Sequence, residues 1–212
     1  SLPIKKIGDL IGEINVVFFS PSELKLVRES PEERRKFMDI DISQTNKRYF
    51  YLLSRYEKIL QNRNKLLKTA ESLNYVKETV DIWDRALVQT AHKIAFEREK
   101  FISSIAPFTK MAQNYLSGGK EEVELKYVCG CSVKLDEKFE ENMAKRLRKN
   151  LEKDFKLGYT SIGVHRDDLD IFLNGVEVKS FGSQGQQRTV ALSRKLAELE
   201  SMFAKTGEYP IL

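Results

Sequence analysis

The sequence predicts an α+β fold in which a helix-rich lobe with long antiparallel helices is flanked by short strands and a final helix. Residues 45–70 and 75–105 each repeat apolar side chains at helical spacing, and the short polar turn between them favours an antiparallel pair. Short apolar or alternating runs before, between and after the helices have the pattern of strands. With 212 residues, 41% of them hydrophobic, the chain can bury one sizeable core or two modest ones.

The first two elements are predicted to be a strand and a capped helix. Residues 14–19 form a continuous apolar run that ends shortly before Pro21, which favours a short strand covered on both faces. Ser30 can cap a helix in which Pro31 takes the first position and Glu33 completes a capping box. We therefore expect a strand and then a helix that begins at residue 31.

Each of the two long helical segments has its apolar residues on one stripe, which we interpret as a core seam. The first stripe consists of Tyr49, Leu52, Leu53, Tyr56, Ile59, Leu60, Leu66 and Leu67. The second follows heptad-like steps through Val76, Val80, Trp83, Leu87, Ile94 and Phe101, with polar interruptions at Thr90 and Glu97. Pro107 is expected to stop or kink this second helix, so that a separate short helix follows.

A strand and an amphipathic helix are predicted next. Residues 122–128 alternate like a half-buried strand, and residues 135–157 repeat an apolar side chain every four positions from Phe139 to Phe155. The opposite face of this helix is basic and holds Lys145, Arg146, Arg148, Lys149 and Lys153. Such a face fits either a solvated surface or a contact with DNA phosphates.

A β-hairpin follows, and a helix start with the chemistry of an anion site comes directly after it. Residues 169–173 alternate, Asn174 and Gly175 favour a type I′ turn, and Val176 and Val178 resume the alternation. Residues 181–189 then lead into a helix whose predicted apolar face is Leu192, Leu196, Leu199 and Phe203.

Ser183 and Gln186 have the spacing of a capping box at the start of that last helix. A helix start leaves backbone amides unpaired and carries partial positive charge, and Gly185 lets a ligand approach the backbone closely. These features suit an anion, although many capped helices bind nothing.

The string Ser-Gln-Gly-Gln-Gln-Arg from Ser183 to Arg188 resembles the signature motif of ABC ATPases, with Gln184 in place of the first glycine. In that superfamily the signature of one subunit meets the γ-phosphate of ATP bound to another. The resemblance therefore implies that Ser183, Gln184, Gly185 and Gln186 contact ATP held by a second copy. Residues 116–119 spell Leu-Ser-Gly-Gly more literally, but a strand follows them, and we interpret them as a turn.

Three segments together resemble the RecF family of ABC/SMC-type ATPases. Residues 19–39 resemble its pattern F-x-P-x-x-L followed by S-P-x-x-R-R-x-F-L-D, and residues 163–169 resemble G-P-H-R-D-D-L with Val164 in place of proline. The signature, with residues 208–212 behind it, resembles the stretch that leads into the family's Walker B strand. Arg166 is then either an ion-pair partner or a residue near the nucleotide. Asp167 and Asp168 are neighbours on an extended segment, so we do not expect them to hold a metal together.

This resemblance implies an internal part of a RecF-type protein, with Walker A before Ser1 and Walker B after Leu212. Residues 1–21 would be a strand segment of the ATPase head, residues 22–157 a helical lobe, and residues 158–212 the hairpin, signature motif and signature helix. ATP and Mg²⁺ would serve the full-length protein, and we expect the chain alone to bind neither and to be catalytically inactive. The residues at its end, Tyr209 to Leu212, have the pattern of a buried strand.

The implied partners are DNA, either double-stranded or at a single/double-strand junction, a second copy of the protein in an ATP-dependent homodimer, and RecR. Through RecR would come RecO and RecA loading. Cys129 and Cys131 are too few for a disulfide framework or a zinc site of their own, and no apolar run reaches membrane-spanning length, so we expect a cytoplasmic protein without a membrane partner. Two alternatives stay open: another SMC-like ABC ATPase, which would have a longer heptad insertion, and a helical scaffold that binds protein partners.

Overall fold

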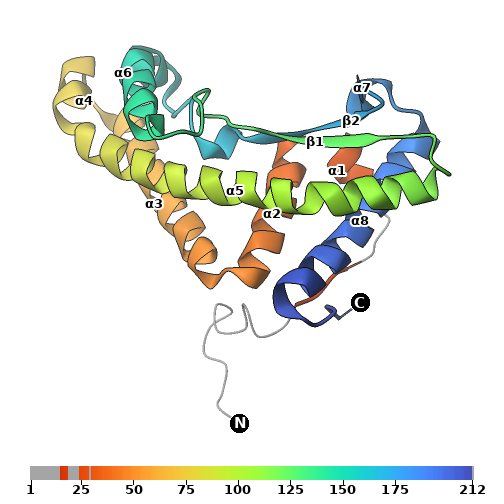
Figure 1. The fold of residues 1–212 in the computed structure, drawn as a ribbon. Coiled ribbons are helices and arrows are strands. Elements are labelled where there is room, and N and C mark those ends of the chain that lie inside the picture. The colour runs from red at the N-terminus through yellow and green to blue at the C-terminus, as the bar shows by residue number, and fades with distance from the viewer. Residues whose placement is uncertain (1–14, 19–23, 29, 212) are drawn as a thin grey trace, which may run out of the picture. The chain divides into compact units, whose positions relative to one another are not determined.

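The structure, a computed structural model, describes residues 15–18, 24–28 and 30–211 (Figure 1). Helices dominate and one small antiparallel sheet accompanies them, so the α+β prediction is confirmed. The chain divides into two compact units. The first unit comprises Ser1–Arg48, Arg98–Val128 and Asp168–Leu212, and the second comprises Tyr49–Glu97 and Cys129–Asp167. The resemblance to the RecF family predicts boundaries after residues 21 and 157. These boundaries differ from those of the two compact units and stay a prediction.

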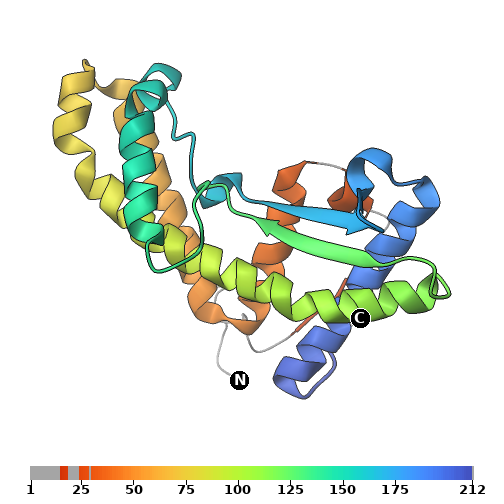
Figure 2. The same cartoon turned by 45° about the horizontal axis from the view of Figure 1, so that its top comes forward.

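The sheet of the first unit has the strand order β1, β2, β3, and Figure 2 shows β1 and β2 side by side. Its strands are β1 (Val123–Val128), β2 (Asp168–Leu173) and β3 (Val176–Glu177). Val123 lies opposite Leu173, and both side chains are buried. Asn174 and Gly175 connect β2 to β3 with φ angles of 50° and 78°, as the predicted type I′ turn requires.

The predicted alternation after this turn is wrong at Val178. That residue begins the short helix α7 (Val178–Phe181) instead of continuing β3. Its side chain is buried, and its carbonyl accepts a hydrogen bond from the amide of Gly182 at 3.0 Å. The Val178 side chain can be buried within the first unit with either an extended or a helical backbone. A pattern of alternating residues does not distinguish these two conformations.

The predicted terminal strands meet each other. Val16 forms a parallel bridge with Ile211, and the amide of Val17 donates to the Ile211 carbonyl at 2.9 Å. Part of the predicted 14–19 strand, residues 14 and 19, lies outside the described residues. The expectation that the strand at 209–212 is buried is wrong for Tyr209 and Ile211, which are exposed because no further strand of the described chain covers them.

The helices α1 (Leu24–Arg28) and α2 (Pro31–Thr45) precede the sheet in the chain. The start of α2 at Pro31 confirms the prediction, but the predicted capping box does not form. The Ser30 side chain makes no cap hydrogen bond, and the amide of Glu33 reaches the Ser30 backbone carbonyl at 3.2 Å. Proline at the first helical position lacks an amide and so reduces the number of donors that need a cap.

The second unit contains most of α3 (Lys47–Thr69), then α4 (Leu73–Thr79), α6 (Phe139–Leu157) and the single-turn 3₁₀ helix η3 (Val164–Arg166). The long helix α5 (Asp81–Leu116) begins in this unit. A small cluster of Leu67, Val76, Val80 and Leu151 joins α3, α4 and α6 through buried apolar contacts. The two predicted stripes therefore do form a core. The predicted turn lies at residues 70–72, but the helix predicted over residues 75–105 is divided at Val80 into α4 and α5.

The predicted stop at Pro107 is wrong, because α5 continues to Leu116 without a separate short helix after it, whereas the alternative of a kink stays a prediction. Pro107 removes one backbone donor, which costs about 3 kcal/mol in an isolated helix. Ile102 and Ile105 before it and Thr109 and Gln113 after it are all buried. Packing on both sides of Pro107 therefore outweighs the local penalty.

The amphipathic helix α6 begins at Phe139, four residues later than predicted. The carbonyl of Asp136 accepts from the Phe139 amide at 3.0 Å, and the Asp136 side chain accepts from the amide of Lys138 at 2.9 Å. These bonds form a turn before the helix and delay its start. None of the described helices is long and apolar enough to cross a bilayer.

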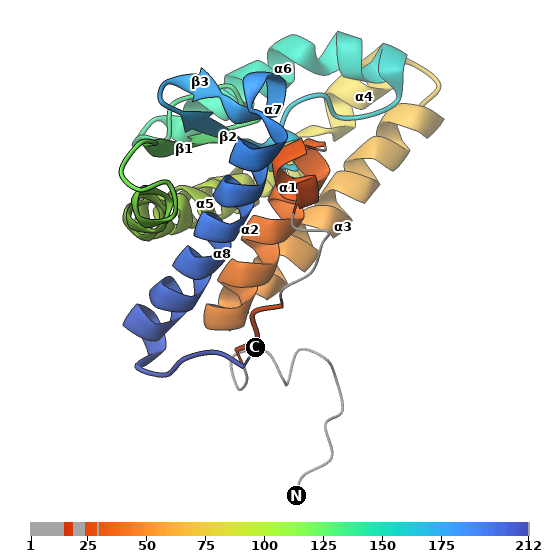
Figure 3. The same cartoon turned by 90° about the vertical axis from the view of Figure 1, so that its right-hand side faces the viewer.

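The last helix, α8 (Gln184–Thr206), lies along α1 and α2 (Figure 3). The apolar face predicted for it is not the buried one, because Leu192 is 42% and Phe203 40% exposed. The buried face is largely polar and includes Gln187, Ser193, Arg194, Lys195, Glu198 and Ser201. The guanidinium of Arg194 lies 4.2 Å from the centre of the Phe37 ring and bonds to Glu198, so this charge is buried with partners.

Candidate functional site

The start of α8 forms the capping box that the sequence predicts. The Ser183 hydroxyl accepts from the Gln186 amide at 3.3 Å, and the Gln186 side-chain oxygen accepts from the Ser183 amide at 2.9 Å. Ser183, Gln184 and Gly185 are exposed. The helix start that carries the motif is therefore accessible to a second molecule.

The backbone amides of Gln184 and Gly185 are the donors that this cap leaves over. No acceptor for either amide is present among the residues that the structure describes. A helix of 23 residues adds the positive end of its dipole at this point. Two parallel amides at the start of a long helix suit an anionic oxygen.

Gly185 is not required by the packing of the fold. A Cβ at this position would meet no atom closer than the Ser183 hydroxyl oxygen at 3.9 Å. Glycine destabilises a helix by about 0.5–1 kcal/mol relative to alanine. The residue therefore weakens the helix without an internal steric reason, and what it provides is access to the backbone from outside.

Glu121 holds the Gln186 side chain in place. The Gln186 amide group donates to one Glu121 oxygen at 3.1 Å, and the Gln113 amide group donates to the other at 2.8 Å. Both functional ends of the Gln186 side chain are thus engaged within the fold, so this residue orients the helix start. Sequence reasoning missed Glu121, because it lies 65 positions before Gln186 and no local pattern connects them.

Arg166 lies in the second unit, whereas Ser183 lies in the first. Its side chain is exposed, with the guanidinium carbon 5.5 Å from the centre of the Tyr159 ring. The ion-pair alternative gains no support, since no carboxylate of the described residues pairs with Arg166. Asp167 accepts from the Gly130 amide at 2.7 Å, and Asp168 pairs with Arg34 at 2.5 Å, so the adjacent carboxylates have different partners.

The basic face of α6 is exposed at all five predicted positions: Lys145, Arg146, Arg148, Lys149 and Lys153. Part of its charge is balanced locally. Lys145 pairs with Glu141 at 2.5 Å, and Arg148 lies 3.8 Å from Asp81. Contact with DNA through this face stays a prediction.

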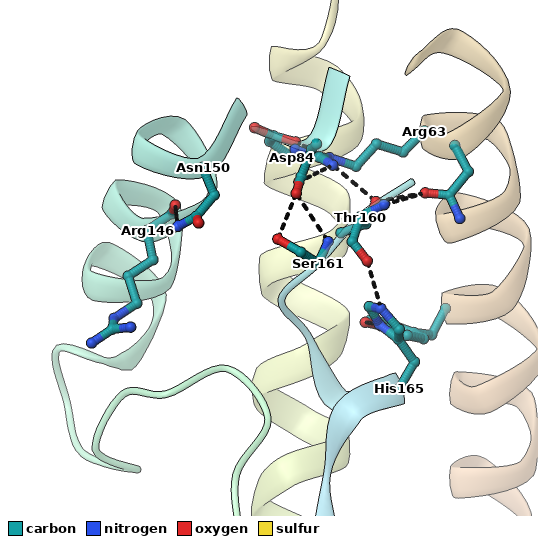
Figure 4. Close-up of polar contacts among 10 residues, drawn as sticks. Arg63, Asp84, Arg146, Asn150, Thr160, Ser161 and His165 are labelled. Carbon is teal, nitrogen blue, oxygen red and sulfur yellow. Dashed lines mark hydrogen bonds and ion pairs between the residues drawn. The ribbon is translucent and has the colours of Figure 1, made fainter. Parts of the chain in front are cut away.

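A buried polar network in the second unit, drawn in Figure 4, was missed by sequence reasoning. Its centre is Arg63, which is fully buried and pairs with Asp84 and Asp154. A signal existed in the sequence. Arg63 stands four residues after Ile59 and four before Leu67, in the middle of the apolar stripe, where a charge must find partners.

Several curated proteins similar to this chain carry the same name. The chain is 45% identical over 212 residues to "DNA replication and repair protein RecF" of Clostridium perfringens strain 13 and 43% identical over 215 residues to the protein of that name from Alkaliphilus oremlandii. Each alignment covers the whole chain but 57% and 58% of the relative, so the chain spans little more than half the length of these proteins. No protein-family model matches the chain.

Solved structures agree with these relatives. The "recombination mediator protein RecF-ATPrS in RecFOR pathway" superimposes with a TM-score of 0.90 at 33% identity, covering 98% of this chain and 56% of that one. The same mediator described as "RecF-ATP" gives a TM-score of 0.90 over 99% of this chain.

Proposed function

The chain is RecF-like along its whole length, and we propose from this that it forms the signature-bearing part of a DNA-repair ATPase of the RecFOR pathway. In this proposal the start of α8 contacts the γ-phosphate of ATP that a second copy has bound, so that ATP joins two copies. The similar solved structures are described as RecF-ATP and RecF-ATPrS, which supports a nucleotide role for the complete protein.

The observation that carries the proposal is the pair of exposed amides at Gln184 and Gly185. They stand beside the Ser183 hydroxyl at the positive end of a 23-residue helix. A terminal phosphate has three oxygens that accept hydrogen bonds, and this helix start offers donors without any rearrangement of the backbone. Gln186 acts by orienting the cap, and Ser183, Gln184 and Gly185 make the contact.

In this proposal, hydrolysis requires groups beyond those that the described residues bring to the start of α8. Residues that bind Mg²⁺ and position water would come from the remainder of the protein and from the second copy. In the complete protein, ATP and Mg²⁺ would close the dimer, and the chain by itself would neither hydrolyse ATP nor retain it.

Closure of the dimer would present a surface for DNA at gaps or junctions, and RecR would join it and bring RecO and RecA loading. The exposed cations of α6 would contribute phosphate contacts that do not depend on base sequence. These events would take place in the cytoplasm.

The substitution Ser183→Arg in a protein of RecF length that carries this chain tests the ATP-dependent contact. The arginine side chain would fill the space that the phosphate needs. We expect ATP-dependent dimerisation, measured by analytical ultracentrifugation with and without ATP, to be lost. ATP binding by the monomer, measured with a fluorescent ATP analogue, should change less than about twofold, because the phosphate-binding loop of the same copy is untouched.

Ser72→Arg is the matched control. Ser72 is an exposed helix cap whose hydroxyl accepts from the Tyr75 amide at 3.3 Å, the same distance as in the Ser183 cap. It therefore loses an equivalent bond and gains the same charge at a different helix start. Dimerisation that survives Ser183→Arg, or that is lost equally in Ser72→Arg, would disprove the proposed contact.

A further inference from the structure

We propose that residues 159–167 form a preorganised phosphate-binding loop in which Arg166 is the ligand-contacting side chain and Tyr56, Arg63 and His165 are positioning residues. The loop leads from the end of α6 through η3 to β2. Its polar side chains turn inward to the second unit, with the exception of Arg166 and the Tyr159 ring beside it. The inference depends on the proposed function only for the choice of the two ligands to be tested.

Arg63 connects the beginning of the loop to two carboxylates of the second unit. Its guanidinium pairs with Asp84 at 2.6 Å and with Asp154 at 2.9 Å, and it donates to the Thr160 hydroxyl at 2.8 Å. Arg63 and Asp154 are both fully buried. A planar guanidinium fixed by two carboxylates holds its third partner in one position, so Thr160 cannot move independently of α3 and α5.

Thr160 and Ser161 each donate two further hydrogen bonds, one from the backbone amide and one from the side-chain hydroxyl. The amide and the hydroxyl of Thr160 both donate to the Asn64 side-chain oxygen, at 2.8 and 2.7 Å. The amide and the hydroxyl of Ser161 both donate to Asp154, at 3.0 and 2.5 Å. Figure 4 shows Arg63, Thr160 and Ser161 gathered at this point. The loop backbone is therefore held by α3 on one side and by α6 on the other.

His165 closes the loop onto its own beginning. Its Nε2 lies 3.0 Å from the Thr160 carbonyl, which can only accept, so Nε2 carries the proton. Its Nδ1 lies 2.8 Å from the Tyr56 hydroxyl and is then the acceptor of that bond. The tautomer and the ring orientation of His165 are thus set by one carbonyl and one hydroxyl, and the backbone of the next residue, Arg166, is set with them.

Two glycines allow the loop to pass this close to its supports. A Cβ at Gly163 would stand 2.3 Å from the Tyr56 hydroxyl, and a Cβ at Gly130 would stand 2.4 Å from the backbone carbonyl carbon of Arg166. The Gly130 amide also donates to buried Asp167 at 2.7 Å. Arg166 is therefore held between a fixed histidine and a fixed aspartate, and its backbone has little freedom.

This arrangement exposes the guanidinium of Arg166 to solvent beside the aromatic ring of Tyr159. Arg166 lies 5.5 Å from the centre of the Tyr159 ring and pairs with no carboxylate of the described chain. A guanidinium on a rigid backbone binds phosphate oxygens bidentately, with little loss of side-chain entropy. The second unit has 17 Lys and Arg residues against 13 Asp and Glu, which also favours an anionic ligand. Phosphate oxygens of this kind belong to the DNA backbone and to ATP.

The experiment measures the binding of DNA and of ATP to a protein of RecF length that carries this chain. One arm uses a fluorescein-labelled DNA duplex, and the other uses a fluorescent ATP analogue. Arg166→Ala should weaken binding in one arm by about tenfold. If that arm is DNA, the slope of affinity against salt should fall by about one unit, because one phosphate contact is lost. Arg166→Lys should recover part of the affinity, since the charge remains without the bidentate geometry.

Tyr56→Phe tests the positioning role, because it removes only the hydroxyl that holds Nδ1 of His165. It should weaken the same arm by about twofold to fivefold and leave the salt slope unchanged, since no charge is removed. Arg55→Ala and Tyr75→Phe are matched controls at exposed positions of the second unit, and both should leave binding unchanged.

Loss of DNA affinity in Arg166→Ala would assign the loop to nucleic acid, and loss of ATP affinity would assign it to nucleotide. Unchanged affinity in both arms would overturn the phosphate-binding loop, and an unaffected Tyr56→Phe variant would overturn the positioning role. Neither result depends on Ser183→Arg, because monomer binding is measured here and dimerisation is measured there.

Discussion

Two segments of the first unit contain a serine followed within two residues by glycine, and they lie at opposite ends of helices. Ser117, Gly118 and Gly119 follow the C-terminus of α5, where Gly118 and Gly119 have φ angles of 62° and 80°. Ser183, Gln184 and Gly185 begin α8. The end of a helix exposes carbonyl oxygens, whereas its start exposes amides, so only the second segment suits a phosphate. Residues that match a signature motif therefore suit a phosphate only where they stand at the start of a helix and not at its end.

The two segments are also connected to each other. The Ser117 hydroxyl accepts from the Glu121 amide at 3.1 Å, and Glu121 in turn holds Gln186 at 3.1 Å. The segment that spells the motif more literally therefore supports the one that carries the site.

The largest difference is expected between two alanine substitutions. Gly185→Ala should weaken ATP-dependent dimerisation by about tenfold or more, because a methyl group would stand where the phosphate approaches. The same change should raise the free energy of unfolding by about 0.5–1 kcal/mol, since its Cβ meets open space in a helix. Ultracentrifugation with ATP and chemical denaturation measure the two quantities.

Gly118→Ala should show the reverse pattern. Its φ angle of 62° is unfavourable for alanine, so the free energy of unfolding should fall by about 1 kcal/mol. Dimerisation should remain within about twofold of the unsubstituted protein, because the end of a helix exposes carbonyl oxygens, which do not attract a phosphate. If the two substitutions had the same effect on dimerisation, the distinction between helix start and helix end would fail.

The buried face of α8 predicts a pH dependence of stability that arises from Asp41, which packs against it. Burial raises the pKa of the Asp41 carboxyl well above its usual range, and the nearby Glu198 carboxylate raises it further. Arg194, Lys195 and Lys205 of α8 act in the opposite direction but do not outweigh these effects. Folded Asp41 therefore holds its proton at pH values where the unfolded chain has lost it.

The stability that protonated Asp41 contributes is fully present below the unfolded pKa and is lost as pH rises through the raised folded pKa. Within that window the free energy of unfolding should fall by about 1.4 kcal/mol per pH unit. Asp41→Asn should remove this slope, because an amide does not ionise. Denaturation at a series of pH values measures it, and an unchanged slope in the variant would contradict a protonated Asp41.

The smallest effect is expected at the connection between the two segments. Glu121→Ala removes the acceptor of Gln186 and Gln113, so the free energy of unfolding should fall by about 1 kcal/mol. Dimerisation should weaken by about twofold to threefold, because the cap of α8 loses its support while its amides remain. Glu124→Ala, an exposed neighbour on β1, is the control and should change neither quantity.

Local sequence patterns predicted the parts of the structure that are held by neighbours in the chain. The Ser183 capping box and the Asn174-Gly175 turn depend on residues within a few positions of each other, and both formed as expected. The same kind of reasoning was wrong at Pro107, where packing keeps the helix intact, and on α8, where the predicted apolar face is half exposed. In both places contacts from distant segments outweighed the local preference.

The sequence by itself determined the α+β composition, the order of the main elements and the capped, glycine-bearing start of α8, because these depend on short-range sterics and hydrogen bonding. Tertiary structure alone decided that Glu121 holds Gln186, and that Arg63 holds Thr160 and Tyr56 holds His165 in the loop that carries Arg166. Those partners are separated by dozens of residues, and a polar side chain that leaves water must be satisfied by whatever donors and acceptors the fold brings to it. Which groups these are follows from the packing of the whole unit.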